Sequence, residues 1–131
     1  MNRYRSIMLV DDDSISNFIT ESRLRIISKE FRIQRFSNGR KLLDFFETKW
    51  ENEEEFFPAL MLLDLNMPVM DGVEFLSKFQ TLKNADKCDV VILSSSTREF
   101  DKQISKEFPQ ILGYIEKPFN GDKLLELIDD G

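Results

Sequence analysis

The sequence predicts an α/β fold with a doubly wound, five-stranded parallel sheet, and three observations support this prediction. Short hydrophobic runs alternate with stretches of helical periodicity, which is typical of βαβ units. The runs at residues 7–10, 60–63 and 90–93 are continuously apolar, as expected for central strands that are covered on both faces. With 131 residues, the chain has the size of one domain. We therefore expect a three-layer α/β/α domain with five helices.

The first half of the chain is expected to hold two strands and two helices. After the first strand, a helix is indicated by apolar residues that share one face, namely Ile15, Phe18, Ile19 and Ile26. Residues 31–36 alternate in polarity, which favours an edge strand. A second helix begins at Asn38 or Gly39 and carries an apolar set formed by Leu42, Leu43, Phe45 and Phe46. The acidic residues at 47–58 are expected to form a solvated helix end and loop.

The second half is expected to hold three further helices around the central third and fourth strands. Asp71 is placed to cap the third helix, whose apolar face is formed by Val73, Leu76, Phe79 and Leu82. The fourth helix is indicated by Phe100, Ile104 and Phe108 at four-residue spacing, which predicts a buried stripe. The fifth strand, at residues 112–115, is short and should be an edge. The last helix uses Leu124, Leu127 and Ile128.

Composition excludes several classes of protein. The formal net charge of −6 argues against nucleic-acid binding by bulk electrostatics. The sequence contains no His, so it lacks the usual zinc ligand and cannot carry a phosphohistidine. Cys88 is alone, which rules out an internal disulfide and favours a reducing, cytoplasmic setting. No apolar run approaches the ~20 residues of a membrane helix, so no membrane association is expected.

Polar residues that can take part in chemistry lie at the ends of four of the expected strands. Asp11 and Asp12 follow the first, Asp64 follows the third, Ser94 ends the fourth, and Lys117 follows the fifth. The carboxyl ends of parallel strands meet at the edge where open α/β sheets bind ligands. Clustered carboxylates repel one another, so their close approach is tolerable beside a divalent cation such as Mg²⁺. An ammonium and a hydroxyl at the same edge favour the binding of an anion. Together they indicate a phosphoryl site in which a carboxylate is the nucleophile.

The motifs at these positions strongly resemble the receiver domain of two-component response regulators. The matching pieces are Leu9 to Asp12, Asp64 to Gly72, Ser94, and Tyr114 to Phe119. The resemblance covers the whole chain and implies a flavodoxin-like sheet of order 2-1-3-4-5. It also implies that residues 1–131 form a single, stand-alone receiver domain without an output domain.

The resemblance implies a role for each carboxylate. Asp64 would be the phosphoacceptor, which is converted to 4-aspartylphosphate. Asp12 would bind Mg²⁺ directly and Asp11 through water, while Asp64 itself and the backbone carbonyl of Asn66 would complete the metal site. Mn²⁺ is an alternative cation. Asp13, in contrast, is expected to cap or begin the first helix rather than bind metal.

Other residues would bind the phosphoryl group or respond to it, according to the same resemblance. Lys117 would pair with Asp64 and then with its phosphoryl group, and the bond from Lys117 to Pro118 would be cis. Ser94 would turn inward to a phosphoryl oxygen, and Tyr114 would follow into the space behind it. Asn66 and Ser96 occupy the positions that tune dephosphorylation.

The function implied is a signalling switch of a two-component or phosphorelay pathway. A histidine kinase or a histidine phosphotransfer protein would be the phosphodonor. The domain would catalyse its own Mg²⁺-dependent phosphorylation and dephosphorylation without turning over an external substrate. A protein target, or a second copy in a dimer, would read the fourth helix, fifth strand and fifth helix, over residues 98–106, Tyr114 and residues 124–128.

Two other functions compete with this interpretation. In a haloacid dehalogenase-type phosphatase, Asp11 would be the nucleophile and Asp13 the general acid, but Asp64 and its motif would then be unexplained. A degenerate receiver would only dock partners, although all the residues needed for phosphorylation are present.

Overall fold

The computed structural model describes residues 4–27, 30, 32–49, 56, 58–67, 69–95, 104 and 106–129, and these include five strands in one parallel sheet. The strands are β1 (Ser6–Val10), β2 (Arg32–Phe36), β3 (Ala59–Leu63), β4 (Cys88–Ser94) and β5 (Ile111–Glu116). Their order is β2-β1-β3-β4-β5. The predicted order 2-1-3-4-5, with the two weaker strands at the edges, is therefore confirmed.

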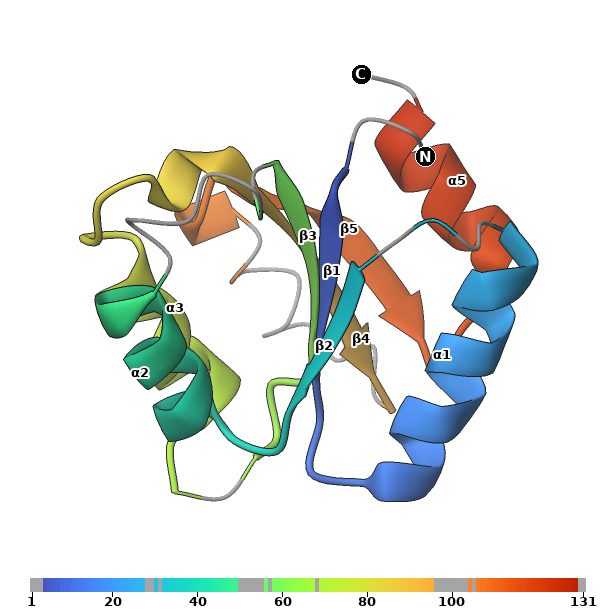
Figure 1. Ribbon diagram of the computed structural model, residues 1–131, viewed down its shortest axis with the longest axis horizontal. Helices are drawn as coiled ribbons and strands as arrows, with labels where there is room; N and C mark the ends of the chain where they lie inside the picture. The colour runs from blue at the N-terminus through green and yellow to red at the C-terminus, as the bar shows by residue number, and fades with distance from the viewer. Residues whose placement is uncertain are drawn as a thin grey trace.

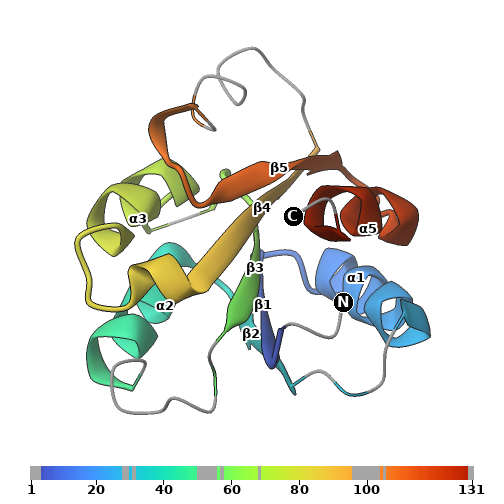
Figure 2. The same ribbon diagram turned by 90° about the horizontal axis from the view of Figure 1, so that it is seen from above.

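Helices cover both faces of the sheet, as predicted for a three-layer fold. They are α1 (Ser14–Ile27), α2 (Gly39–Thr48), α3 (Gly72–Phe79) and α5 (Gly121–Asp129), and a short 3₁₀ turn, η3 (Ala85–Lys87), precedes β4. In Figures 1 and 2, α2 and α3 lie on one side of the sheet and α1 and α5 on the other. The strands all run in the same direction, so their carboxyl ends gather at the lower edge of the sheet in Figure 1.

The described residues contain four α-helices, where five were expected. Most of the expected fourth helix, including Phe100, lies outside the described residues. Ile104 is helical, and both Ile104 and Phe108 are buried against the α2 and α3 side of the sheet. The burial predicted for these two residues is therefore confirmed.

Two hydrophobic clusters, one on each face of the sheet, form the core. Successive residues of a strand point to opposite faces, so β1 contributes Met8 to one cluster and Ile7 to the other. A group of aromatic rings fills the α2 and α3 side, where the ring centroids of Phe46 and Phe79 are 4.7 Å apart. Cys88, in the same cluster, is fully buried, and desolvation with the nearby charge of Asp89 raises the pKa of its thiol far above the ordinary value.

Most of the apolar residues of α1 do not pack against the core. Its apolar residues do share one face, but this face points to solvent: Ile15 is 70% exposed, Phe18 64% and Ile26 84%. The buried face carries Asn17, Thr20 and Leu24. Periodicity identifies residues that share a face, but not the direction in which that face points. We call the set formed by the exposed residues Ile15, Phe18 and Ile26 and the half-buried Ile19 the α1 stripe.

Polar caps begin three of the helices at the carboxyl edge of the sheet. Asp13 accepts hydrogen bonds from the backbone N–H groups of Ile15 and Ser16, and therefore caps α1. Asp71 caps α3, as predicted, and Asn38 caps α2, whose start was expected at Asn38 or Gly39. These caps fix the loops that carry the candidate site.

Gly72 allows α3 to begin close to β3. A Cβ atom at this position would lie 2.8 Å from the Cα atom of Leu65, which is too close for any other residue without a shift of the backbone. Among the described residues, no helix is both long and apolar enough to cross a membrane.

Candidate functional site

Four strands bring their polar ends together at the carboxyl edge of the sheet. Asp11 directly follows β1, Asp64 directly follows β3, Ser94 is the last residue of β4, and Lys117 directly follows β5. Three of these side chains are almost fully buried: Asp11 is 4% exposed, Asp64 7% and Ser94 2%. Buried carboxylates are costly unless they are paired or bind a cation, so their partners decide what the site can do.

The Lys117 ammonium bridges two of the carboxylates. Its Nζ atom donates hydrogen bonds to Asp11 Oδ2 at 2.5 Å and to Asp64 Oδ2 at 3.0 Å. The predicted pairing of Lys117 with Asp64 is therefore confirmed, whereas its contact with Asp11 was not foreseen. The sequence indicates that Asp11, Asp64 and Lys117 lie at the same edge of the sheet, but it does not show which oxygens a flexible lysine reaches.

The remaining oxygens of these two carboxylates accept backbone hydrogen bonds. Asp11 Oδ1 accepts from the N–H group of Asp13 at 2.9 Å, and Asp64 Oδ1 accepts from the N–H group of Asn66 at 3.0 Å. The amide of Asn17, which is 8% exposed, donates to the backbone carbonyl of Asp11 at 3.0 Å. Asn17 thus fixes the loop after β1 from within α1.

Sequence reasoning missed Asn17 because its contact is formed to a backbone atom. A usable signal existed, since Asn17 lies on the opposite side of α1 from the stripe, where a polar residue needs a partner if it is buried. Arg23 was missed for the same reason. Its guanidinium donates to the backbone carbonyl of Phe119 and so ties the loop after β5 to α1.

The electrostatics of the site follow from burial and from the excess of acids. Desolvation raises the pKa of Asp64 above its ordinary value, although hydrogen bonds from Asn66 and Lys117 act in the opposite direction. The nearby charge of Asp11 adds to the increase. For Lys117, burial alone would lower the pKa, but hydrogen bonds to Asp11 and Asp64 outweigh it and raise the pKa. The lysine therefore stays charged at neutral pH.

The acidic residues fit a hard divalent cation. Asp11, Asp12 and Asp64 each offer a carboxylate oxygen, and these atoms lie within 4.8 Å of one another. Asp12 is exposed, so a cation held there can keep several water ligands, as Mg²⁺ does in proteins. The exposed Asn66 lies two residues beyond Asp64 in the loop after β3. Three carboxylates beside one ammonium leave an excess of negative charge that a cation would offset.

The loop after β5 is anchored at several points. The peptide bond between Lys117 and Pro118 is cis, as expected. The N–H group of Lys117 donates to the carbonyl of Ser94 at 2.8 Å, which continues the pairing of β4 with β5. The base of the Lys117 side chain is therefore fixed by two neighbouring elements.

The remaining predicted site residues lie close to this constellation or outside the described residues. Tyr114, on β5, packs against the core on the α2 and α3 side, and its buried hydroxyl has no hydrogen-bond partner among the described residues. Ser96 lies outside the described residues. The roles of Ser94 and Tyr114 as switch residues, and of Asn66 and Ser96 in dephosphorylation, stay predictions.

The chain is similar to several known proteins over most of their length. The chain is 28% identical to the chemotaxis protein CheY of Halobacterium salinarum, over 96% of this chain and 95% of the relative. It is 27% identical to the response regulator Rcp1 of Synechocystis, over 97% and 86%. Among solved structures, a two-component response regulator from Cytophaga hutchinsonii has a TM-score of 0.85 at 25% identity and covers 98% of this chain, with 96% of its own chain matched.

A second similar solved structure contains a divalent cation. The Mn²⁺-bound form of the response regulator Rcp1 has a TM-score of 0.71 at 26% identity, over 96% of this chain and 90% of that chain. The family model of the response regulator receiver domain matches residues 7–129, which contain every strand and helix described above except for Ser6, the first residue of β1. With the fold, the strand-end residues and this match in agreement, the chain belongs to the response regulator receiver domain family.

Proposed function

We propose that this protein is a phosphorylation-activated switch that accepts a phosphoryl group from a phosphohistidine onto Asp64. Its family makes it a two-component signalling protein rather than an enzyme that turns over an external substrate. The observation that carries the proposal is the Lys117 ammonium bridging Asp11 and Asp64 next to Asp12. Such a site offers a carboxylate nucleophile, ligands for a cation and a fixed positive charge for the transferred group.

Each residue of the site has a defined task in the transfer. A carboxylate oxygen of Asp64 forms a bond to phosphorus while the bond from phosphorus to the donor's imidazole nitrogen breaks. The nitrogen keeps the electron pair and takes a proton from water. Lys117 is placed to exchange its contact with Asp64 for one with a phosphoryl oxygen, and the Ser94 hydroxyl would donate to another.

Asp11, Asp12, Asp64 and the backbone carbonyl of Asn66 would hold Mg²⁺, or Mn²⁺ in its place. The bound ion would offset the charge of the carboxylates and of the phosphoryl oxygens. The Mn²⁺-bound form of Rcp1, which is 26% identical to this chain, supports the binding of a divalent cation.

The proposed consequence of phosphorylation is a shift between two packings of β4, β5 and the chain between them. The phosphoryl group adds about 1.5–2 negative charges, and Ser94, Lys117 and the metal would compensate that charge best in the active packing. Tyr114, whose ring packs against the core, would move when the packing changes. Asn66 and Ser96 would set the lifetime of the phosphorylated state. A histidine kinase or phosphotransfer protein would act as donor, in the cytoplasm where ATP is supplied.

Labelling by a small donor tests the acceptor directly. The protein is incubated with acetyl phosphate and Mg²⁺, and the modified residue is located by mass spectrometry. Asp64→Asn is expected to abolish the modification, whereas Asp71→Asn, which changes an exposed cap in the same loop, should leave it intact. Undiminished labelling of Asp64→Asn would refute the acceptor assignment, and failure of the wild type to incorporate beryllofluoride would favour a degenerate receiver.

The metal requirement tests the role of Asp12. Because Asp12 is exposed and its neighbours keep their partners, Asp12→Ala should raise the Mg²⁺ concentration needed for labelling by about tenfold or more without loss of stability. Asp122→Ala, at an exposed position at the start of α5, is the matched control. An unchanged Mg²⁺ dependence in Asp12→Ala would contradict the ligand assignment.

The phosphatase alternative has less support from the geometry. Asp13, its general acid, uses Oδ1 to cap α1, and Asp64, which Lys117 contacts at 3.0 Å, would have no role in it. Turnover of a generic phosphate ester by the wild type would restore this alternative.

A further inference from the structure

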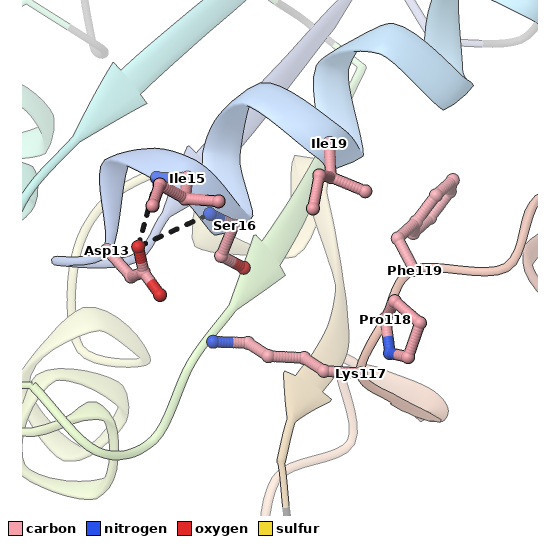
Figure 3. A pocket seen from close by; sticks show the side chains of 7 residues that line it. All are labelled: Asp13, Ile15, Ser16, Ile19, Lys117, Pro118 and Phe119. Carbon is pink, nitrogen blue, oxygen red and sulfur yellow. Dashed lines mark hydrogen bonds between the residues drawn. The ribbon is translucent and has the colours of Figure 1, made fainter.

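Two pockets in the described part of the chain differ in their relation to the phosphoacceptor site. One, of about 290 Å³, lies between α1 and the loop after β5, where Figure 3 shows Ser16 and Ile19 on one side and Lys117 and Phe119 on the other. Because Lys117 also contacts Asp64, this pocket belongs to the phosphoacceptor site. Another, of about 420 Å³, lies beside β2 and α2 and is lined by none of the residues assigned to that site. We call it the β2 cleft.

Aromatic rings form the walls of the β2 cleft, and polar groups lie among them. The ring centroids of Phe36 and Phe45 are 5.4 Å apart, and those of Phe45 and Phe56 are 5.3 Å apart. The guanidinium of Arg32 lies 5.2 Å from the centroid of the Phe56 ring. Apolar walls with a few polar groups are typical of binding sites. The lining residues are Gln34, Arg35, Phe36, Phe45, Lys49 and Phe56.

β2 is the outermost strand beside this cleft, so part of its backbone faces outward (Figure 2). The N–H group of Arg32 and the carbonyl of Phe36 form hydrogen bonds with the residues that flank β1. Backbone groups point to alternate sides along a strand, so those of Ile33 and Arg35 face away from β1. Among the described residues, β2 pairs with β1 alone. The outer N–H and carbonyl groups can therefore pair with an extended segment of another chain.

We propose that the β2 cleft and the outer side of β2 bind an extended segment of a partner protein, in which one large apolar residue is flanked by Asp or Glu. The segment lies beside β2 as an added strand, its apolar side chain enters the cleft, and its carboxylates approach Arg35 and Lys49. β2 and β5 lie at opposite ends of the sheet, so the surface predicted for the signalling target stays free. This binding does not require phosphorylation of Asp64, and so it goes beyond the proposed function.

Charge selects an acidic segment as the occupant. Although the chain has a formal net charge of −6, Arg35 and Lys49 line the cleft and Arg32 lies beside it. Arg35 uses Nε to pair with Glu21 at 3.0 Å, which leaves the terminal nitrogens of the guanidinium as donors to a carboxylate. A basic strand, such as β2 of a second copy, would bring like charges together and is disfavoured. Charges on an outer strand also prevent unselective pairing.

A buried acceptor in the cleft favours a polar ligand over a purely apolar one. The Oε1 atom of Gln34, which lines the cleft, is buried and has no hydrogen-bond partner among the described residues. A buried acceptor without a donor costs free energy. An N–H or O–H group of a bound peptide can supply the donor, whereas a hydrocarbon cannot. The cleft therefore offers apolar contact, an acceptor and positive charge together, which suits a peptide.

Selection from a random peptide library tests the proposed ligand. Phage that display random short peptides are selected on the immobilised wild-type chain, and the affinity of the enriched peptides is measured by fluorescence anisotropy. We expect these peptides to share a large apolar residue with acidic residues on both sides. Lys49→Glu, which reverses an exposed charge in the cleft, should weaken their binding at least tenfold, whereas Lys123→Glu at an exposed position on α5 should not.

A pair of variants at Arg35 tests the added strand. Arg35→Ala and Arg35→Pro both remove the guanidinium and its pairing with Glu21, but only proline also removes the outward N–H group. The backbone groups of the neighbouring residues pair β2 with β1, so proline is tolerated at this position. We expect Arg35→Pro to bind the selected peptides at least fivefold more weakly than Arg35→Ala, with thermal unfolding as the check that both are folded. Equal affinities of the two folded variants would contradict the added strand.

Three further results would overturn the inference. One is enrichment of peptides without acidic residues, or no enrichment above that on an unrelated protein. Another is equal binding of the selected peptides to wild type and Lys49→Glu. The third is a wild-type dimer in sedimentation velocity that dissociates in Lys49→Glu, because a second copy would then occupy the cleft. Labelling of Asp64 by acetyl phosphate should be unchanged in Lys49→Glu. Failure of that labelling in the wild type would refute the proposed function and leave this inference intact.

Discussion

Buried polar groups are paired differently at the two edges of the sheet. The strands begin at the amino edge and end at the carboxyl edge. At the amino edge, the hydroxyl of Tyr4 donates to Asp89 Oδ2 at 2.5 Å, and the hydroxyl of Ser6 donates to the carbonyl of Phe56 at 2.8 Å. Each of these two hydroxyls is paired with one acceptor. At the carboxyl edge, one ammonium serves two carboxylates, and a third stands beside them. The first arrangement serves the fold, and the second keeps negative charge together at a cost in stability.

The backbone shows the same difference. The described residues include two non-glycine residues with positive φ, Asn84 near the amino edge (64°) and Val69 near the carboxyl edge (70°). Asparagine tolerates this conformation, whereas a β-branched residue is strained in it. Strain of this kind is retained where the surrounding structure fixes it, and it is common at functional sites. The loop that follows Asp64 is therefore the less relaxed of the two.

The largest effect on stability is expected from Lys117→Ala. Removal of the ammonium leaves two buried carboxylates facing each other, and the loss should be about 2 kcal/mol, below that of a fully buried pair because Lys117 is partly exposed. Mg²⁺ should restore part of the loss, since a cation replaces the missing charge. Urea unfolding with and without MgCl₂ measures both effects, with the exposed Lys123→Ala as control. A loss that is the same with and without Mg²⁺ would argue against charge compensation.

At the amino edge, Ser6→Ala should cost stability without affecting phosphorylation. The substitution leaves the buried carbonyl of Phe56 without the Ser6 hydroxyl, which costs about 1–2 kcal/mol. Acetyl phosphate should still label Asp64 at the wild-type rate under conditions where the variant is folded. A loss of labelling in the folded variant would show that the two edges are not independent.

A reciprocal exchange of the two positive-φ residues sharpens the comparison. Val69→Asn should stabilise the protein by about 1 kcal/mol by removing strain, and Asn84→Val should destabilise it by at least as much. Thermal unfolding of both variants gives the two differences. If Val69→Asn is neutral, the valine is not strained in its loop.

The smallest effect on stability is expected from Asp64→Asn in metal-free buffer. Hydrogen bonds to Asp64 offset much of the desolvation that raises its pKa. A carboxyl whose pKa is raised by folding contributes stability at low pH that is lost as the pH rises through the folded value. Asp64→Asn lacks this loss, so it should be more stable than wild type at pH 7. The difference should vanish below the ordinary pKa of 3.8. Denaturation at several pH values tests this, and lower stability of Asp64→Asn at pH 7 contradicts it.

Much of this arrangement could be predicted from the sequence, because it depends on local patterns. Continuous apolar runs identified β1, β3 and β4 as central strands, and an acid or a lysine directly after a strand must lie at the carboxyl edge of a parallel sheet. Asp71 was recognisable as a cap because it stands just before an amphipathic segment, and the same signal located the start of α2 at Asn38 or Gly39.

The rest depends on tertiary contacts that leave little trace in the sequence. The direction of the α1 stripe was not evident, because the face that packs on the sheet is the less apolar one, with Asn17 and Thr20. The hydrogen bond from Asn17 to Asp11 and the double contact of Lys117 also need the folded geometry. Asn17 lies six residues from Asp11 and Lys117 lies 106 residues from it, and spacing in the sequence does not pair them.

The burial of Cys88 makes the protein convenient to study by site-directed labelling. Its thiolate is strongly disfavoured and its side chain is inaccessible, so a maleimide or a nitroxide reagent will not modify it in the folded state. It is also the chain's sole cysteine. A single cysteine placed at an exposed position can therefore carry a fluorophore or spin label without any change to the native residue.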